Sequence, residues 1–228
     1  MKEVVVLTGA GISAESGIST FRDSGGLWEN YKYEEVATYE AWEANPALVL
    51  EFYNQRRKQL KQVKPNAAHI ALAGLENKYK VNIITQNVDD LHERSGSSSI
   101  LHLHGELIKA RSTFDSSLIY TLKDWQLNLG DKCEKGYQLR PHIVWFGEEV
   151  PEMINAVPLC QKADIFIVIG TSMQVYPAAG LINFVPGNIP KYYIDPKATD
   201  INYINNLTII KNKASIAVPE LVNDLLKI

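Results

Sequence analysis

The feature that most constrains this chain is a glycine-rich turn that follows an apolar run near the N-terminus. Residues 4–7 are all aliphatic, and the sequence GAGISAESGIS follows at residues 9–19. A strand that leads through Gly9 and Gly11 into a helix lets backbone approach a pyrophosphate closely, and the helix N-terminus offers free N–H groups. The turn therefore predicts a dinucleotide site in a protein that alternates strands and helices.

The turn alone leaves open which cofactor is bound. Ala14 stands where the dinucleotide fingerprint has its third glycine, a slot that also accepts alanine. A tight strand-to-helix turn without a nucleotide is the alternative. A dehydrogenase would need an acidic residue at the end of a second strand, about twenty residues after the turn, to bind the ribose of its cofactor. No such residue is found here. Phe21, Arg22 and a second glycine pair follow instead, which argues against an ordinary dehydrogenase.

Apolar, β-rich runs recur and are separated by helical patterns. They lie at residues 81–85, 165–169, 191–195 and 207–210. This alternation predicts an α/β fold with a Rossmann-like parallel sheet, covered by helices on both faces. Small or polar residues follow most of the runs, which suits one shared cleft at the carboxyl ends of the strands.

Two stretches interrupt the alternation, and we interpret them as insertions that form a smaller lobe. They span about 23–64 and 108–139, which leaves a Rossmann-like core at about 1–22, 65–107 and 140–228 of a single catalytic domain. Residues 219–228 are expected to form a final amphipathic helix.

The composition of the chain indicates which kinds of binding partner and which cellular compartment to expect. A net charge of -3 gives no broad electrostatic reason to bind nucleic acid. Two cysteines, Cys133 and Cys160, form no disulfide framework and suit a reducing cytoplasm. The N-terminus shows no signal peptide, and no apolar stretch approaches the length that spans a bilayer. We therefore expect a cytoplasmic monomer with no nucleic-acid or membrane partner.

Four further blocks carry polar residues that suit a chemical site. They read TQNVDDLH at 85–92, HLHGE at 102–106, RPHIVWFGE at 140–148 and GTSMQVYP at 170–177. With the glycine turn, in this order and spacing, they resemble the sirtuin family of NAD-dependent protein deacylases, in its bacterial, class III-like form. The resemblance runs from the turn to Pro219. It implies an NAD-binding domain and a small lobe, with an acyl-lysine protein or peptide bound between them.

The resemblance implies that NAD is consumed as a co-substrate, which gives nicotinamide, O-acyl-ADP-ribose and free lysine. In that reaction the acyl oxygen attacks C1′ of the nicotinamide ribose, and a base later takes a proton from a ribose hydroxyl. His104 stands at the base position, and a neutral imidazole suits this task near pH 7. Asn87 and Asp89 stand where the family holds ribose and the nicotinamide carboxamide, and they complete the expected catalytic set. Structural hydrogen bonding and helix capping are the alternative roles for these residue types.

The resemblance also implies a larger set of cofactor-binding residues along the glycine turn and the strand ends. They are Gly9, Ala10, Gly11, Ile12, Ser13, Glu15, Phe21, Arg22, Trp28, Gln86, Asn87, Val88, Asp89, Gly170, Thr171, Ser172, Asp195 and Ala214. Asp195 stands where many relatives have asparagine. Its carboxylate can accept from ribose hydroxyls and would repel a 2′-phosphate, which favours NAD over NADP.

A pair of residues points to the acyl group. Tyr53 and Arg56 are three residues apart, so they share a face of a helix. A guanidinium offers a planar fork to a carboxylate, and a phenol adds one more donor. The pair resembles the Tyr-x-x-Arg of sirtuins that remove succinyl and malonyl groups, and the small Ala37 would widen the acyl pocket. A core tyrosine beside a surface arginine is the alternative.

The remaining expected substrate contacts are backbone segments that clamp the peptide by β-augmentation. They contain Val144, Phe146, Gly147, Glu148 and Val175. Succinyl- and malonyl-lysine are thus the expected substrates, with acetyl-lysine as a further one.

The family's structural zinc is not expected here. Most sirtuins hold it with two Cys-x-x-Cys pairs, but the corresponding slots read STFD at 112–115 and CEKG at 133–136. Only Cys133 remains of four ligands, and structural zinc needs four. The lobe would then depend on apolar contacts, for which the candidates are Phe114, Leu118, Tyr120, Leu122, Trp125, Leu127 and Leu129.

Two other functions use the same cofactor. A mono-ADP-ribosyltransferase also releases nicotinamide, and an NAD-binding sensor would have no turnover. Nicotinamide release that requires an acyl-lysine peptide would favour the deacylase over both.

Overall fold

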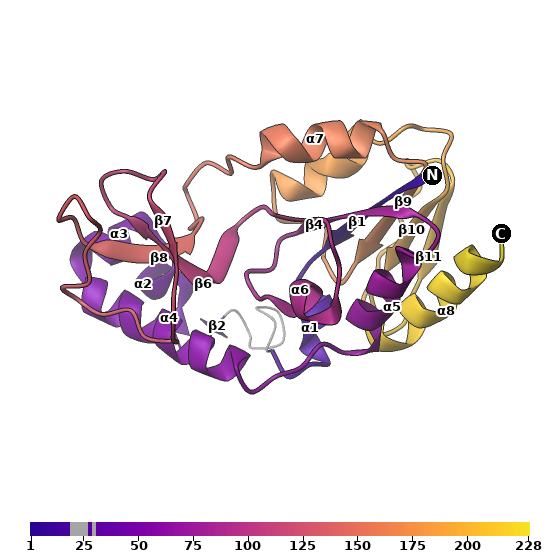
Figure 1. Cartoon of the computed structure of the whole chain (residues 1–228). Helices are drawn as coiled ribbons and strands as arrows, with labels where there is room; N and C mark the ends of the chain where they lie inside the picture. Colours follow the sequence, from indigo (N-terminus) through magenta and orange to yellow (C-terminus); the bar gives the residue numbers. More distant parts are fainter. Residues whose placement is uncertain (19–26, 29–30) are drawn as a thin grey trace.

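A parallel six-stranded sheet, with helices around it, lies at the centre of the larger part of the molecule (Figure 1). The computed structural model describes residues 1–18 and 31–228, together with the backbone of residues 27–28. The sheet order is β11-β10-β9-β1-β4-β5, and every neighbouring pair is parallel. Its strands are β1 (Glu3–Thr8), β4 (Lys80–Thr85), β5 (Ile100–His102), β9 (Ile165–Ile169), β10 (Lys191–Ile194) and β11 (Leu207–Ile210). The predicted Rossmann-like α/β fold is confirmed.

The central strands are buried on both faces, as their continuous apolar sequences predict. Val4 to Leu7 of β1 are fully buried, and Val4 lies opposite Val81 on one side and Ile165 on the other. One face packs on helices α5 (Ala67–Leu75) and α8 (Ala214–Lys227). The other packs on α7 (Met153–Gln161) and the 3-10 helix η1 (Ala178–Phe184), which lie above the sheet in Figure 1.

The strand order places a topological switch point beside β1. From β1 the chain adds β4 and β5 on one side, and it then crosses to add β9, β10 and β11 on the other. The carboxyl ends of β1 and β9 are therefore neighbours whose connections leave in opposite directions. Ligands of open α/β sheets bind at such a point.

A smaller lobe lies to one side of this sheet (Figure 1) and has its own apolar core. Its antiparallel sheet has the order β7-β6-β8. The lobe elements are β2 (Leu27–Trp28), β3 (Tyr31–Lys32), α2 (Tyr33–Val36), α3 (Tyr39–Ala44), α4 (Pro46–Leu60), β6 (Gly105–Ser112), β7 (Ile119–Thr121) and β8 (Leu139–Ile143). The expected insertion limits 108 and 139 thus fall inside β6 and at the first residue of β8. The short helices α1 (Gly11–Ala14) and α6 (Leu91–Ser95) lie between the six-stranded sheet and the smaller lobe (Figure 1).

The expected C-terminal helix is present, but it begins earlier than expected. Helix α8 begins at Ala214, before Pro219, and the Glu15 carboxylate accepts hydrogen bonds from Ser215 N and Oγ at 3.0 and 2.8 Å in its first turn. In the lobe, Phe114 and Leu129 are exposed rather than in the core. Among the described residues, none of the helices is long and apolar enough to cross a membrane.

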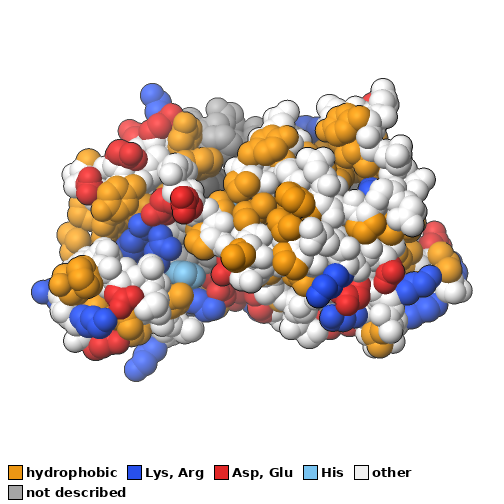
Figure 2. Space-filling model, turned by 90° about the horizontal axis from the view of Figure 1, so that it is seen from above, with side chains coloured by type: hydrophobic (Ala, Val, Ile, Leu, Met, Phe, Trp, Pro, Cys, Tyr) orange, Lys and Arg blue, Asp and Glu red, His pale blue; other side chains and the backbone are white. Residues whose placement is uncertain are grey.

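Charged side chains of both signs are mixed on the face drawn in Figure 2, where hydrophobic groups also gather. A protein that binds nucleic acid through electrostatics presents a broad basic area instead. The expectation of no nucleic-acid partner stays a prediction.

Candidate active site

One cavity of about 790 Å³ lies where the carboxyl ends of the strands face the smaller lobe. Residues expected at the cofactor line it: Gly9, Ala10, Gly11, Glu15, Gln86, Asn87, Val88, Asp89, Gly170, Thr171, Ser172, Asp195 and Ala214. The residues expected at the substrate also line it: Tyr53, Arg56, Val144, Phe146, Gly147, Glu148 and Val175. His104, the expected catalytic base, lines the same cavity. The fold therefore gathers separate sequence blocks around one space.

Some expected cofactor residues are not on this wall. Ile12 is fully buried in the sheet core, and Ser13 lies behind the wall. Phe21 and Arg22 lie outside the described residues, as does the side chain of Trp28.

The glycine turn forms a backbone cradle at the switch point. Gly11 N donates to Gly170 O at 2.8 Å, so the turns after β1 and β9 touch directly. A Cβ at Gly11 would lie 2.6 Å from Gly170 Cα, and one at Gly170 would lie 2.3 Å from Ile12 N. Gly170 also has φ +62°, which favours glycine. The N–H groups of Gly9, Gly11 and Ile12 are bonded to carbonyls within the protein, and α1 has only four residues. The turn is therefore suited to a pyrophosphate by the close approach that its glycines allow, rather than by the dipole of a long helix.

Ser13 holds the two polar side chains that follow β4. Its Oγ donates to Asp89 Oδ2 at 3.0 Å and accepts from Asn87 Nδ2 at 3.1 Å. Leu91 N donates to the second oxygen of Asp89 at 3.2 Å. Burial raises the pKa of Asp89, and the bonds from Leu91 and Ser13 counteract that rise. These contacts leave the two residues in fixed positions at the cavity wall, and Ser13 is a supporting residue rather than a wall residue.

His104 has the geometry of a base at this cavity. Its Nδ1 lies 3.0 Å from Gln86 O, and a carbonyl can only accept, so Nδ1 carries the proton and Nε2 keeps its lone pair. Burial lowers the pKa of His104, and the bond to Gln86 partly opposes this effect. The imidazole is therefore neutral at pH 7 and able to accept a proton through Nε2.

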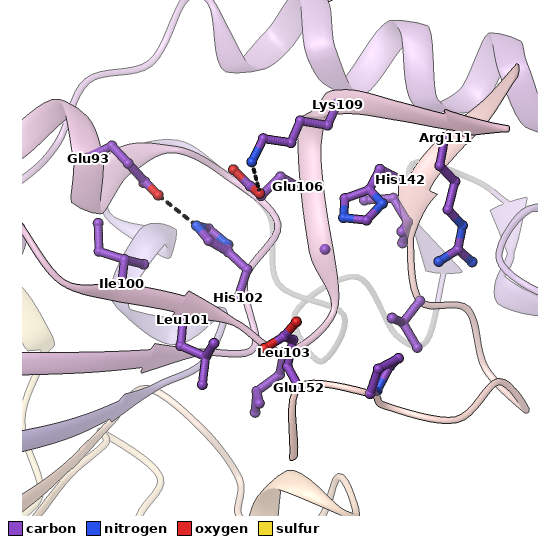
Figure 3. Close-up of a pocket in the computed structure, with 14 residues that line it drawn as sticks. Glu93, Ile100, Leu101, His102, Leu103, Glu106, Lys109, Arg111, His142 and Glu152 are labelled. Carbon is purple, nitrogen blue, oxygen red and sulfur yellow. Dashed lines mark hydrogen bonds and ion pairs between the residues drawn. The ribbon is translucent and has the colours of Figure 1, made fainter. Parts of the chain in front are cut away.

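His102 lies on the other side of the same segment, in a second cavity of about 400 Å³ (Figure 3). Its Nδ1 lies 3.0 Å from Asn87 O and its Nε2 lies 2.7 Å from Glu93 Oε1. Burial lowers the pKa of His102, but the Glu93 carboxylate outweighs this and raises it overall. Glu93, His102 and Glu106 could together approach a metal ion, yet Glu106 already pairs with Lys109 at 2.5 Å. His102 thus supports the backbone of Asn87.

Ala37, Tyr53 and Arg56, the residues expected to meet the acyl group, all line the main cavity. Tyr53 and Arg56 both lie on α4 and are only 3% and 8% exposed, so the arginine is not on the surface. The next residue, Arg57, is also buried, but it is bound to carbonyls of the lobe at Trp125 O (2.6 Å) and Leu107 O (3.4 Å). Of the two adjacent arginines, Arg56 is the one that lines the cavity.

The rim of the cavity is formed by backbone on both sides. Val144 N donates to His104 O at 2.9 Å, and Phe146 N donates to Ala37 O at 3.0 Å. Val175 is exposed on the facing segment. Glu148 accepts from Arg140, with the closer contact at 2.7 Å, and from Trp145 N at 2.7 Å, so its carboxylate stabilises this segment.

The positions that correspond to the two Cys-x-x-Cys pairs, at 112–115 and 133–136, do not fit a structural zinc. Cys133 Sγ donates to Ser112 Oγ at 3.4 Å, and Asp115 pairs with Lys135 at 2.8 Å. Gly136, the fourth slot, has no side chain to offer. One thiol, one hydroxyl and one ion-paired carboxylate are not the set of four ligands that such zinc needs.

Sequence reasoning missed several residues of this site. Ile18, Gln59, Leu60, Lys197 and Lys213 also line the cavity. It also missed the contact between Trp145, within the expected segment 144–148, and Tyr53, in which the indole Nε1 lies 3.0 Å from the hydroxyl. No local pattern could have found this contact, because the two residues are 92 positions apart and meet only in the folded lobe.

Comparison with known proteins shows the same architecture and a close sequence relationship. The Sir2 family model matches residues 9–177. An "NAD-dependent protein deacylase" of Helicobacter pylori is 56% identical over 229 residues, covering 100% of this chain and 97% of its own. One of the same name from Bacteroides thetaiotaomicron is 55% identical, covering 97% of each chain. A solved Sir2 homologue in complex with NAD is 40% identical with a TM-score of 0.89, covering 99% of this chain and 90% of its own.

Proposed function

This chain belongs to the Sir2 family and is an NAD-dependent protein deacylase, and we propose that it removes succinyl and malonyl groups from lysine in preference to acetyl groups. The observation that supports this preference is the buried placement of Tyr53 and Arg56 at the wall of the main cavity. A guanidinium offers a planar fork of donors that matches a carboxylate, and a phenol adds one more donor. A succinyl or malonyl carboxylate that enters beside Ala37 would meet these donors at the cavity wall.

Residues of the chain would bind NAD, accept a proton and bind the peptide in this reaction. NAD, bound as co-substrate, supplies an electrophilic ribose carbon once its glycosidic bond to nicotinamide breaks. The glycine cradle would hold its pyrophosphate, and Asn87 and Asp89 would hold its nicotinamide end. His104 Nε2 would accept the proton of a ribose hydroxyl. The rim at Val144 and Val175 would bind the peptide backbone on either side of the acyl-lysine.

The acyl preference is tested by kcat/KM for succinyl- and acetyl-lysine forms of one peptide. We expect the unmodified enzyme to favour succinyl-lysine and Arg56→Met to reverse the order, because methionine keeps the bulk but removes the fork of donors. Lys58→Met is the matched control, since it removes a charge from an exposed position of the same helix and should leave both rates unchanged. An unmodified enzyme that prefers acetyl-lysine would overturn the proposal.

The same assay separates the deacylase from the two other functions that use NAD. Nicotinamide release only in the presence of an acyl-lysine peptide fits the deacylase. ADP-ribose attached to a protein without loss of an acyl group would indicate a transferase, and NAD binding without any release would indicate a sensor.

A further inference from the structure

Trp145 is held rigidly in the lobe core, two residues after the end of β8. It is 2% exposed, and its backbone N donates to the Glu148 carboxylate at 2.7 Å. The Arg140 guanidinium carbon lies 3.4 Å from the centre of its ring, and the Trp42 ring lies 5.8 Å away. The indole therefore has little freedom to move, and its polar edge has a defined direction.

That polar edge meets the hydroxyl of Tyr53. Trp145 Nε1 lies 3.0 Å from Tyr53 Oη, and both side chains are buried. An indole nitrogen can only donate, so the tyrosine oxygen must be the acceptor in this bond. The hydroxyl then keeps its own proton to donate elsewhere, and Tyr53 lines the main cavity.

The protonation of Tyr53 agrees with a donor role. Burial raises the pKa of Tyr53 to about 12, while the charge of Arg56 and the bond from Trp145 offset part of the rise. The hydroxyl is thus protonated throughout the neutral range. A hydroxyl that already accepts one hydrogen bond is also polarised as a donor.

We propose that Trp145 is a positioning residue for acidic acyl groups: by donating to the Tyr53 hydroxyl, it orients that hydroxyl so that its own proton is donated to the carboxylate of the substrate. This inference rests on the proposed function. It predicts that Trp145 affects the recognition of the acyl carboxylate and leaves the chemistry at the ribose alone.

The test is Trp145→Phe, which keeps an aromatic ring but removes the N–H. We expect KM for a succinyl-lysine peptide to rise about five- to tenfold with kcat little changed, and both constants for the acetyl-lysine peptide to stay within about twofold. In a Tyr53→Phe background the same change should have almost no effect on succinyl-lysine, because the two residues act as one unit. Trp42→Phe is the matched control, since it removes a neighbouring indole for which no bond to Tyr53 occurs among the described residues. It should affect both substrates equally.

Two results would overturn the inference. One is an equal loss of succinyl and acetyl activity in Trp145→Phe, with a lowered melting temperature, which indicates a purely structural role. The other is an undiminished effect of Trp145→Phe in the Tyr53→Phe background. If the unmodified enzyme prefers acetyl-lysine, the proposed function fails and this inference fails with it; if it prefers succinyl-lysine, either result removes the inference alone.

Discussion

His102 and His104 show how one intervening residue separates two roles. In an extended segment, residues two apart share a face in a regular strand, but the chain turns at His104, and the two imidazoles enter different cavities. Each Nδ1 meets a backbone carbonyl of the segment after β4, at Asn87 O and Gln86 O. The Nε2 of His102 is hydrogen-bonded to Glu93, whereas the Nε2 of His104 is available to a ligand in the main cavity.

His104 predicts a specific pH dependence. Because burial holds its pKa below the usual 6.5 of histidine, the neutral base persists on the acid side of neutrality. We expect kcat/KM to be flat above about pH 6.5 and to fall as pH drops through the lower pKa of His104. His104→Ala should remove this limb and reduce deacylation by about 10²–10⁴. An unchanged pH profile in His104→Ala would contradict the assignment, and His142→Asn, in the second cavity, serves as the control.

At the scale of elements, the glycine turn has two tasks. The sequence suggests that its glycines make room for a pyrophosphate. In the structure Gly11 also lies in backbone contact with Gly170, so the ends of β1 and β9 can approach only if neither carries a side chain. The same positions thus serve the fold and the proposed cofactor site.

Gly11→Ala tests this contact. A new Cβ 2.6 Å from Gly170 Cα must push the two turns apart, and we expect a cost of about 1–3 kcal/mol, or several degrees in melting temperature. The stabilisation that NAD adds should shrink as well. Gly74→Ala is the control, because nothing lies within 4 Å of its added Cβ in helix α5, and it should gain up to about 1 kcal/mol. Equal behaviour of both variants in thermal melts with and without NAD would count against the contact.

At the scale of the whole molecule, the smaller lobe is a separate core attached to the sheet. Leu127 and Leu139 pack in it beside Cys133, and Asn54 and Arg57 bind the lobe backbone from α4. These contacts join segments that in most sirtuins a metal site would help to hold together.

The lobe should therefore be stable without zinc. We expect elemental analysis of the purified protein to find no stoichiometric zinc, and a strong chelator to leave the melting temperature and deacylase activity unchanged. The physical reason is that the slots at Ser112, Asp115 and Cys133 are occupied by mutual hydrogen bonds and an ion pair. One zinc per chain would refute this prediction.

The sequence by itself determined the parallel sheet, the family and most of the cavity wall. Short, continuous runs rich in β-branched residues indicate buried strands, and polar residues that end parallel strands meet at one edge of the sheet. For that reason the positions of Asn87, Gly170 and Asp195 at one cavity followed from local patterns.

Only the tertiary structure decided the contacts between distant segments. Glu15 sets the start of α8 across 200 residues, and Trp145 meets Tyr53 across 92. The tertiary structure also decided that Arg56 is buried rather than exposed. Such contacts depend on how the lobe and the sheet pack against one another, and no local periodicity or propensity records that packing.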